Sequence, residues 1–371
     1  MLTPKQIEIL QNQSEALMDD VINYLYEDII RCVKEAGQIT NTVEYHVWLL
    51  KRFGLNNKNI IDGLNSRLDK TNENINKLIV DAAKTSYNGD IAKLGVKAIP
   101  FGENEPLQRL IAGIVKVADG DFANITKTIG FIGLDGKYSP LTKFYRQTSD
   151  YAFKMVSTGA MDYNKAVYEA TKTLLSQGVK SVNYESGMIT SIDAAVKRNV
   201  MSSIGNLTNE ISEMNHDELG ATGWEISAHG ACAEDHEFIQ GRQFTDKEFK
   251  KLNESLTRPI GTLNCGHVAY PVFIGKTKPV YSEAELQEMK QQNKTGVVFQ
   301  GKHYTEYEAT QKQREIERKI RKEKRKLNGY KEMDNKEREQ EEKIKINRLY
   351  SFYNSFSKKC GLATRYGLTR V

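Results

Sequence analysis

The chain has 371 residues, of which 39% are hydrophobic and 27% are charged, with a formal net charge of +5 at pH 7. A single hydrophobic core usually stops growing near ~250–300 residues, so this length predicts two or three domains rather than one compact globule. The longest apolar runs, at 110–118 and 129–134, fall far short of the ~20 residues that span a membrane, and the N-terminus lacks the pattern of an export signal, so we expect neither membrane insertion nor export.

The N-terminal part, residues 1–130, has the pattern of a helical region. Thr3 and Gln6 stand at the spacing of a capping box, and apolar residues then recur at helical intervals until Gly37. A second stretch with helical spacing, 42–53, ends before a glycine, the residue type that most often follows a helix. We therefore expect successive amphipathic helices in this region.

The sequence pattern of residues 131–216 predicts a central helical region that contains a short hairpin. Apolar spacing typical of helices covers three stretches, 145–157, 163–177 and 191–214. Between the last two, Val179 and Val182 alternate with polar residues ahead of a turn at Ser186 and Gly187. This alternation predicts a short strand or hairpin.

The pattern changes again near residue 217. Short β-like pieces separated by turn residues predict a small α+β domain at 217–277, and 278–371 returns to helical spacing in a strongly charged C-terminal region. The predicted fold class is therefore mainly α with a small α+β domain that contains His and Cys residues. We expect several segments arranged in an elongated molecule, because the polar C-terminal helices have little core of their own to bury.

Metal-type side chains are concentrated in the predicted α+β domain: His229, Cys232, His236, Cys265 and His267. Cys232 and His236 would share a face of a helical turn, and Cys265 and His267 one side of a strand. A tetrahedral zinc site is therefore a candidate, although the spacing fits no standard zinc finger. The alternative is a set of buried thiols and imidazoles that hydrogen-bond within a small β fold. No other cofactor is expected, and the scattered cysteines favour a reducing compartment.

A metal-dependent nuclease is the enzymatic alternative for the same residues. His236 or His267 would serve as the general base and a metal would bind the phosphate. Glu234 and Asp235 adjoin the cluster, but neither has an evident acidic partner, so the set of catalytic groups is incomplete. The chain also lacks the Lys-Ser/Thr of a P-loop after its GFIGLDG segment and any G-x-S-x-G motif. We therefore expect no enzyme activity.

Two segments carry a recognisable pattern, HGACAEDHEFIQGRQF at 229–244 and NCGHVAYPVFIG at 264–275. The pair resembles the signature of the phage minor capsid protein 2 family, and further segments up to CGLATRYGLTR at 360–370 follow the order of that family. The family-motif positions in this chain are Gln240, Gly241, Arg242, Asn264, Tyr270 and Pro271. Many members have Ala-Arg-Pro where this chain has Cys-Ala-Glu at 232–234, so no role of that arginine is carried over.

This resemblance implies a structural minor capsid protein of a tailed bacteriophage of Gram-positive bacteria, related to head-morphogenesis proteins of the phage Mu type. It implies a low-copy component of the head or portal vertex whose partners are the portal and other head proteins. The implied location is the virion, with the host cytoplasm during assembly. The family has no shared catalytic reaction, in agreement with the incomplete catalytic set.

A basic run in the C-terminal region has nine Lys and Arg against three Glu between residues 311 and 330. The local excess of positive charge is therefore larger than the net charge of the whole chain. It predicts either a solvated helix with Glu–Lys pairs or a sequence-independent contact with packaged DNA or an acidic portal surface. We expect these cations on the charged face of the helix, so that neutralising four of them would leave the fold unchanged. The candidate contact residues are Arg314, Arg318, Lys319, Arg321, Lys322, Lys324 and Arg325.

Overall fold

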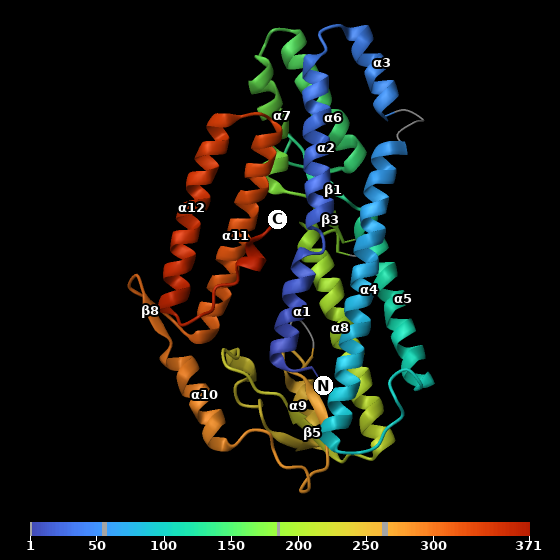
Figure 1. Ribbon diagram of the computed structural model, residues 1–371, viewed down its shortest axis with the longest axis vertical. Coiled ribbons are helices and arrows are strands. Elements are labelled where there is room, and N and C mark those ends of the chain that lie inside the picture. The colour runs from blue at the N-terminus through green and yellow to red at the C-terminus, as the bar shows by residue number, and fades with distance from the viewer. Residues whose placement is uncertain (1, 54–57, 184–185, 262–265) are drawn as a thin grey trace.

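Helices dominate the computed structural model, which describes residues 2–53, 58–183, 186–261 and 266–371. In chain order the helices are α1 (Pro4–Ala16), α2 (Asp19–Gln38), α3 (Thr42–Phe53), α4 (Lys58–Leu94), α5 (Glu105–Lys127), α6 (Leu141–Ser157), α7 (Tyr163–Gln177), α8 (Ile192–Leu219), α9 (Asp246–Ser255), α10 (Glu283–Thr295), α11 (Glu306–Glu332) and α12 (Lys336–Lys359). The predicted class, mainly α with a small α+β part, is confirmed. The molecule is elongated, with the long helices roughly along its length (Figure 1).

Signals in the local sequence determine where α1 begins and which face of α2 is buried. The side chain of Thr3 accepts a hydrogen bond from the main chain of Gln6, and the main chain of Thr3 donates to the Gln6 side chain, which completes the predicted capping box of α1. In α2 the apolar positions recur on one face, where Val21, Leu25 and Ile29 are fully buried. This face directs α2 into the centre of the molecule.

The long helices share one hydrophobic core. In it α2 packs on α6 and α7, while α4 and α5 pack on α8 (Figure 1). Buried members come from both sides of residue 130, including Ile79 of α4, Phe131 and Leu207 of α8. The predicted N-terminal and central regions therefore fold together as one helical body.

A four-stranded antiparallel sheet lies within this body. Its strands are β1 (Gly130–Ile132), β2 (Tyr138–Pro140), β3 (Lys180–Val182) and β4 (Ile189–Ser191), in the order β2-β1-β3-β4. Ser181 faces Thr190 across β3 and β4, so the hairpin predicted from the alternating valines is confirmed. Residues 184–185 of its turn lie outside the described part of the chain.

The small α+β part is built on a three-stranded antiparallel sheet. Its strands, β5 (Gly223–Ile226), β6 (Gln243–Thr245) and β7 (Ala269–Val272), have the order β6-β5-β7, and the 3-10 helix η1 (Glu234–His236) lies between β5 and β6. A separate small core, made by Trp224, Ile226, Ile239, Ile260 and Ala269, lies beneath helix α9. This part occupies the end of the molecule where α1 begins (Figure 1).

The C-terminal region forms an antiparallel pair of helices, α11 and α12, preceded by the hairpin of β8 (Val297–Phe299) and β9 (Lys302–Tyr304) and followed by the 3-10 helix η2 (Tyr366–Thr369). The pair has its own core around Ile316, Ile320, Tyr353 and Phe356. We call this region, 306–371, the C-terminal hairpin. Among the described residues, no helix is long and apolar enough to cross a membrane.

Candidate functional site

The predicted His/Cys cluster lies where two loops of the small α+β part meet. His229 and Cys232 follow β5, His236 ends η1, and His267 precedes β7. The imidazole rings of His229 and His267 have centroids 4.4 Å apart, and those of His236 and His267 5.2 Å apart. The Sγ of Cys232 lies 3.5 Å from Nε2 of His267. The fold thus brings together four of the five predicted residues; Cys265, the fifth, lies outside the described part of the chain, as does Asn264.

Hydrogen bonds fix the orientation of these rings. Nε2 of His267 donates to the side-chain oxygen of Gln240 over 3.2 Å, and Nε2 of His236 donates to the main-chain oxygen of Arg258 over 2.7 Å. Burial, together with the neighbouring His229 and His236, lowers the pKa of His267 to about 2, so this ring is neutral at physiological pH. Gln240 also accepts from the main-chain N–H of His229, which places a family-motif residue at the centre of the cluster.

Within the described residues, no group of three His, Cys, Asp or Glu side chains is arranged to hold a metal ion. His229 nevertheless has a free coordination atom: its Nδ1 donates to the oxygen of Gly230 over 2.6 Å, and its buried Nε2 has no hydrogen-bond partner in the described structure. Zinc at the cluster therefore stays a prediction. The structure gives no support to the nuclease hypothesis at Asp235, the acidic residue beside the cluster. Arg258 binds its carboxylate through Nε over 2.7 Å and lowers its pKa.

The other family-motif residues have structural contacts. Tyr270 donates a hydrogen bond to the fully buried carboxylate of Glu225, and Lys93 of α4 places its Nζ 3.0 Å from the centroid of the Tyr270 ring. Arg242 is 3.2 Å from Glu283 at the start of α10, and Pro271 faces Trp224 across β5 and β7. Tyr270 thus joins the small α+β part to the helical body.

Gly241 is required by its surroundings. Its φ is +72°, a conformation that residues with a Cβ rarely adopt, and a Cβ there would lie 2.4 Å from Cδ2 of Leu286. The glycine therefore lets α10 pack directly against the turn that follows the cluster.

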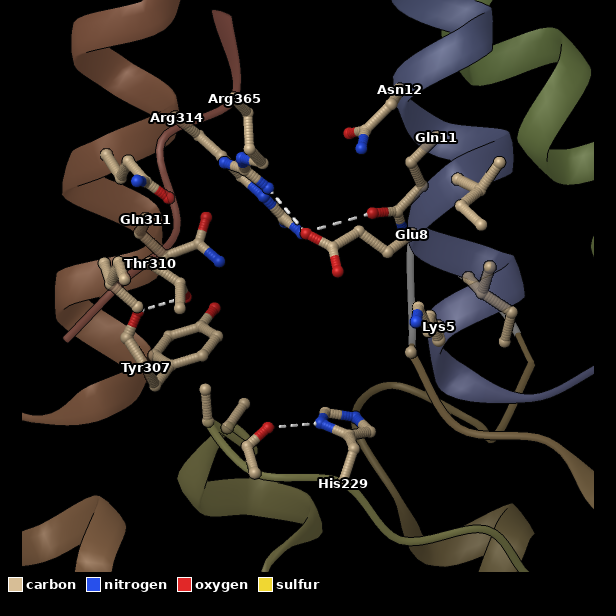
Figure 2. Close-up of a pocket in the computed structure, with 18 of the residues that line it drawn as sticks. Lys5, Glu8, Gln11, Asn12, His229, Tyr307, Thr310, Gln311, Arg314 and Arg365 are labelled. Carbon is tan, nitrogen blue, oxygen red and sulfur yellow. Dashed lines mark hydrogen bonds and ion pairs between the residues drawn. The ribbon is translucent and has the colours of Figure 1, made fainter. Parts of the chain in front are cut away.

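A cavity of about 690 Å³ separates the cluster from α1 and α11 (Figure 2). His229 lines one wall, while Arg314 and Arg365 project from the C-terminal hairpin toward Glu8 and Gln11 of α1. Nη1 of Arg365 lies 2.6 Å from Glu8. The helical body, the small α+β part and the C-terminal hairpin thus all line one cavity.

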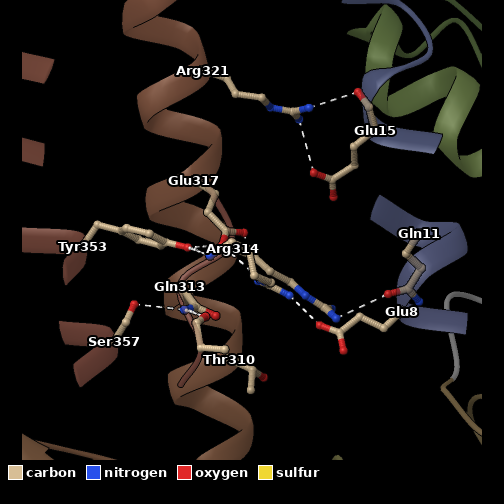
Figure 3. Close-up of polar contacts among 12 residues, drawn as sticks. Glu8, Gln11, Glu15, Thr310, Gln313, Arg314, Glu317, Arg321, Tyr353 and Ser357 are labelled. Carbon is tan, nitrogen blue, oxygen red and sulfur yellow. Dashed lines mark hydrogen bonds and ion pairs between the residues drawn. The ribbon is translucent and has the colours of Figure 1, made fainter. Parts of the chain in front are cut away.

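The basic helix predicted from the sequence is α11, but its cations do not share one solvated face. Arg321 is only 5% exposed and binds Glu15 of α1, while Arg325 binds Asp19 and Asp193 (Figure 3 shows the first of these contacts). The expectation that all of these cations lie on the charged face of the helix was wrong for Arg321 and Arg325, because both are internal ion-pair partners, and their neutralisation is therefore expected to affect the fold.

The remaining predicted cations of α11 have varied surroundings. Arg314 donates to the amide oxygen of Gln11 over 3.3 Å, and Lys324 lies over the ring of Tyr350. Lys319 is 2.6 Å from Glu315 on its own helix, the Glu–Lys pairing that the sequence predicts for a solvated face. Arg318 and Lys322 are exposed.

A buried carboxylate in α11 holds the end of the chain. Glu317 accepts from the hydroxyl of Tyr353 over 2.8 Å and from Nη2 of Arg365 over 2.9 Å, and burial raises the pKa of its carboxyl despite the nearby arginine. The same tyrosine oxygen accepts from the main-chain N–H of Arg365 over 2.6 Å. Sequence reasoning missed this site, since Glu317 has the pattern of a solvated residue.

Comparison with known protein families gives a match over nearly the whole chain. A family model described as phage minor capsid protein 2 matches residues 2–356. No curated protein and no solved structure matches the chain. The match includes the helical body, the small α+β part with its His/Cys cluster and most of the C-terminal hairpin.

Proposed function

The chain belongs to the phage minor capsid protein 2 family, and from this we propose that it is a low-copy structural component of the portal vertex that acts in head morphogenesis of a tailed phage. The observation that carries the proposal is the extent of the match, which includes all three parts of the molecule. A structural role agrees with the site, where the family-motif residues Gln240, Gly241 and Tyr270 hold the fold together.

The partners we propose are the portal and other head proteins, with packaged DNA as a further contact. The exposed cations Arg318, Lys319 and Lys322 of α11 are suited to an acidic protein surface or to DNA phosphates. Such a contact would be independent of DNA sequence, because phosphate contacts position a protein without reading bases.

Mass spectrometry of purified virions beside empty proheads tests the proposal. We expect the protein in both particles at a few copies relative to the major capsid protein. A strain that lacks the gene should accumulate defective heads, and expression of the protein in trans should restore them. Absence of the protein from mature virions and proheads, with normal heads in the deletion strain, would overturn the proposed role.

A further inference from the structure

A second cavity, of about 560 Å³, lies between α11 and the helical body. One wall is the basic face of α11, from Arg314 to Arg325. The opposite wall includes Lys180 of β3 and Lys197 and Arg198 of α8, three cations that the sequence pattern did not connect with the basic helix. In total eight cationic side chains and two carboxylates, Glu15 and Asp193, line this cavity.

The two carboxylates are already occupied by internal ion pairs. Glu15 binds Lys197 and Arg321, and Asp193 lies 3.1 Å from Nη1 of Arg325. Within the described parts of the chain, the other five cations have no carboxylate at ion-pair distance: Lys180, Arg198, Arg314, Arg318 and Lys322. The cavity therefore contains a large excess of positive charge.

Two further features make the cavity suited to an anion. The first turn of the 28-residue helix α8 forms part of the wall through Ser191 and Ala194, so the positive end of the helix dipole faces it. Burial and the charge of Lys322 also lower the pKa of Lys180, while Asp193 acts in the opposite direction, so like charge at this wall disfavours the charged form of the lysine.

We propose that this cavity binds phosphate groups, either of a free nucleotide or of the phosphorylated end of a nucleic-acid strand. A volume of about 560 Å³ suits a small ligand, and several arginines can each present two N–H groups to one phosphate. An acidic peptide distributes its charges along an extended chain, whereas a phosphate group places them on one centre that several cavity cations can reach together.

A ligand in this cavity would contact both the helical body and α11. Because it would bind the docked arrangement of the C-terminal hairpin, it would stabilise that arrangement, with a gain that grows as the logarithm of ligand concentration above the dissociation constant. This goes beyond the proposed place of the protein in the particle and does not depend on it, since binding is a property of the purified chain.

The test is isothermal titration calorimetry of the full-length protein with inorganic pyrophosphate at low salt. We expect saturable binding at one site. Replacing Lys180→Ala together with Lys322→Ala should weaken it at least tenfold, because both side chains face the cavity. Neither lysine has an ion-pair partner among the described residues, so the melting temperature of this variant should stay within a few degrees of the wild type.

The matched control is Lys319→Ala together with Lys331→Ala, which removes the same charge from exposed positions of α11 outside the cavity wall. Binding should change less than twofold in this control. Equal weakening in both variants would show a diffuse electrostatic effect and overturn the proposal. Binding of an oligoglutamate peptide without binding of pyrophosphate would also overturn it, in favour of an acidic protein partner.

Three probes distinguish the two sources of phosphate: a deoxynucleoside triphosphate, a 5′-phosphorylated single-stranded oligonucleotide and the same oligonucleotide with a 5′-hydroxyl. Binding of the triphosphate alone supports a nucleotide site. Binding of the phosphorylated strand in preference to the hydroxyl strand supports a strand end. Equal binding of both strands, also in the cavity variant, would place the contact outside the cavity and overturn the proposal.

Discussion

Arg321 in α11 and Glu15 in α1 form an ion pair between opposite ends of the sequence, with Nη2 and Oε2 3.3 Å apart. Nη1 of the same arginine donates to the main-chain oxygen of Glu15 over 3.0 Å. Arg325 makes the corresponding contacts with Asp19 and Asp193 one turn further along α11. Along this stretch, charged groups hold the C-terminal hairpin to the helical body.

The first prediction concerns this ion pair. Arg321→Ala should lower the free energy of unfolding by about 2–3 kcal/mol, below the full ~3–5 kcal/mol for breaking a buried pair, because Lys197 still neutralises Glu15. Urea unfolding measures the loss. The control is Arg318→Ala, an exposed arginine one turn earlier, which should change stability by less than ~0.5 kcal/mol. Equal effects of the two substitutions would contradict an internal role for Arg321.

The second prediction concerns the tyrosine that holds the chain end. Tyr353 is fully buried, and its hydroxyl serves both Glu317 and the main chain of Arg365. Tyr353→Phe should cost about 1–3 kcal/mol, the usual penalty for buried polar groups left without a partner. Tyr366→Phe removes a hydroxyl that, among the described residues, bonds only Asn354 at an exposed position, and its effect should be within ~0.5 kcal/mol. Chemical denaturation of both variants would show whether the difference exists.

Much of the fold follows from local sequence signals. The capping box at Thr3, the apolar spacing of α2 and the hairpin of β3 and β4 all depend on neighbours in sequence. The proximity of His229 and His267 was also predictable, because each lies in one of the two motif segments. What local pattern could not show was the partner of each charge. Arg318 and Arg321 have similar sequence surroundings, yet one is exposed and the other is buried against a residue near the N-terminus.

Sequence analysis also missed the buried carboxylates, because their hydrogen-bond partners lie far away in the sequence. Glu225 lies in a short strand where a charged residue normally marks the solvent side. Its burial depends on Tyr270, Gln243 and the main-chain N–H of Val280, which come from other strands and loops. Only the assembled fold shows that these donors meet at one point.

The third prediction tests zinc at the His/Cys cluster. If zinc binds there, full-length protein purified without chelators should contain it near 1:1, and Cys232→Ala should lower both zinc content and melting temperature. Cys360→Ala, a cysteine in the C-terminal hairpin, is the control and should leave zinc content unchanged. Only traces of metal in the wild-type protein would favour imidazoles held by hydrogen bonds to Gln240 and Arg258. Elemental analysis by mass spectrometry gives the answer directly.

The fourth prediction separates backbone strain from packing at Gly241. Gly136 has a similar positive φ of +76°, but a Cβ there would meet no atom within 4 Å. Gly136→Ala should therefore cost about 1–2 kcal/mol from backbone strain alone. Gly241→Ala should cost a further ~1–3 kcal/mol, because its Cβ would collide with Leu286 and displace α10. Thermal and urea unfolding should show the larger loss of stability for Gly241→Ala. Equal losses of stability would show that α10 can shift away from the added Cβ with no loss of free energy.

The last prediction concerns pH and the contact of Lys93 with Tyr270. Burial lowers the pKa of Lys93 to about 8, whereas a lysine in the unfolded chain titrates near ~10.4. Between these values the unfolded state holds a proton that the folded state has lost, so this group makes the free energy of unfolding rise with pH, by at most about 1.4 kcal/mol per unit. Wild-type protein should therefore gain stability relative to Lys93→Met between pH 7.5 and 9.5. Lys97→Met, at an exposed position after the same helix, should show a constant difference from wild type over that range. Urea unfolding at both pH values measures the two differences, and a constant difference for Lys93→Met would mean that burial does not lower the pKa of Lys93 in the folded protein.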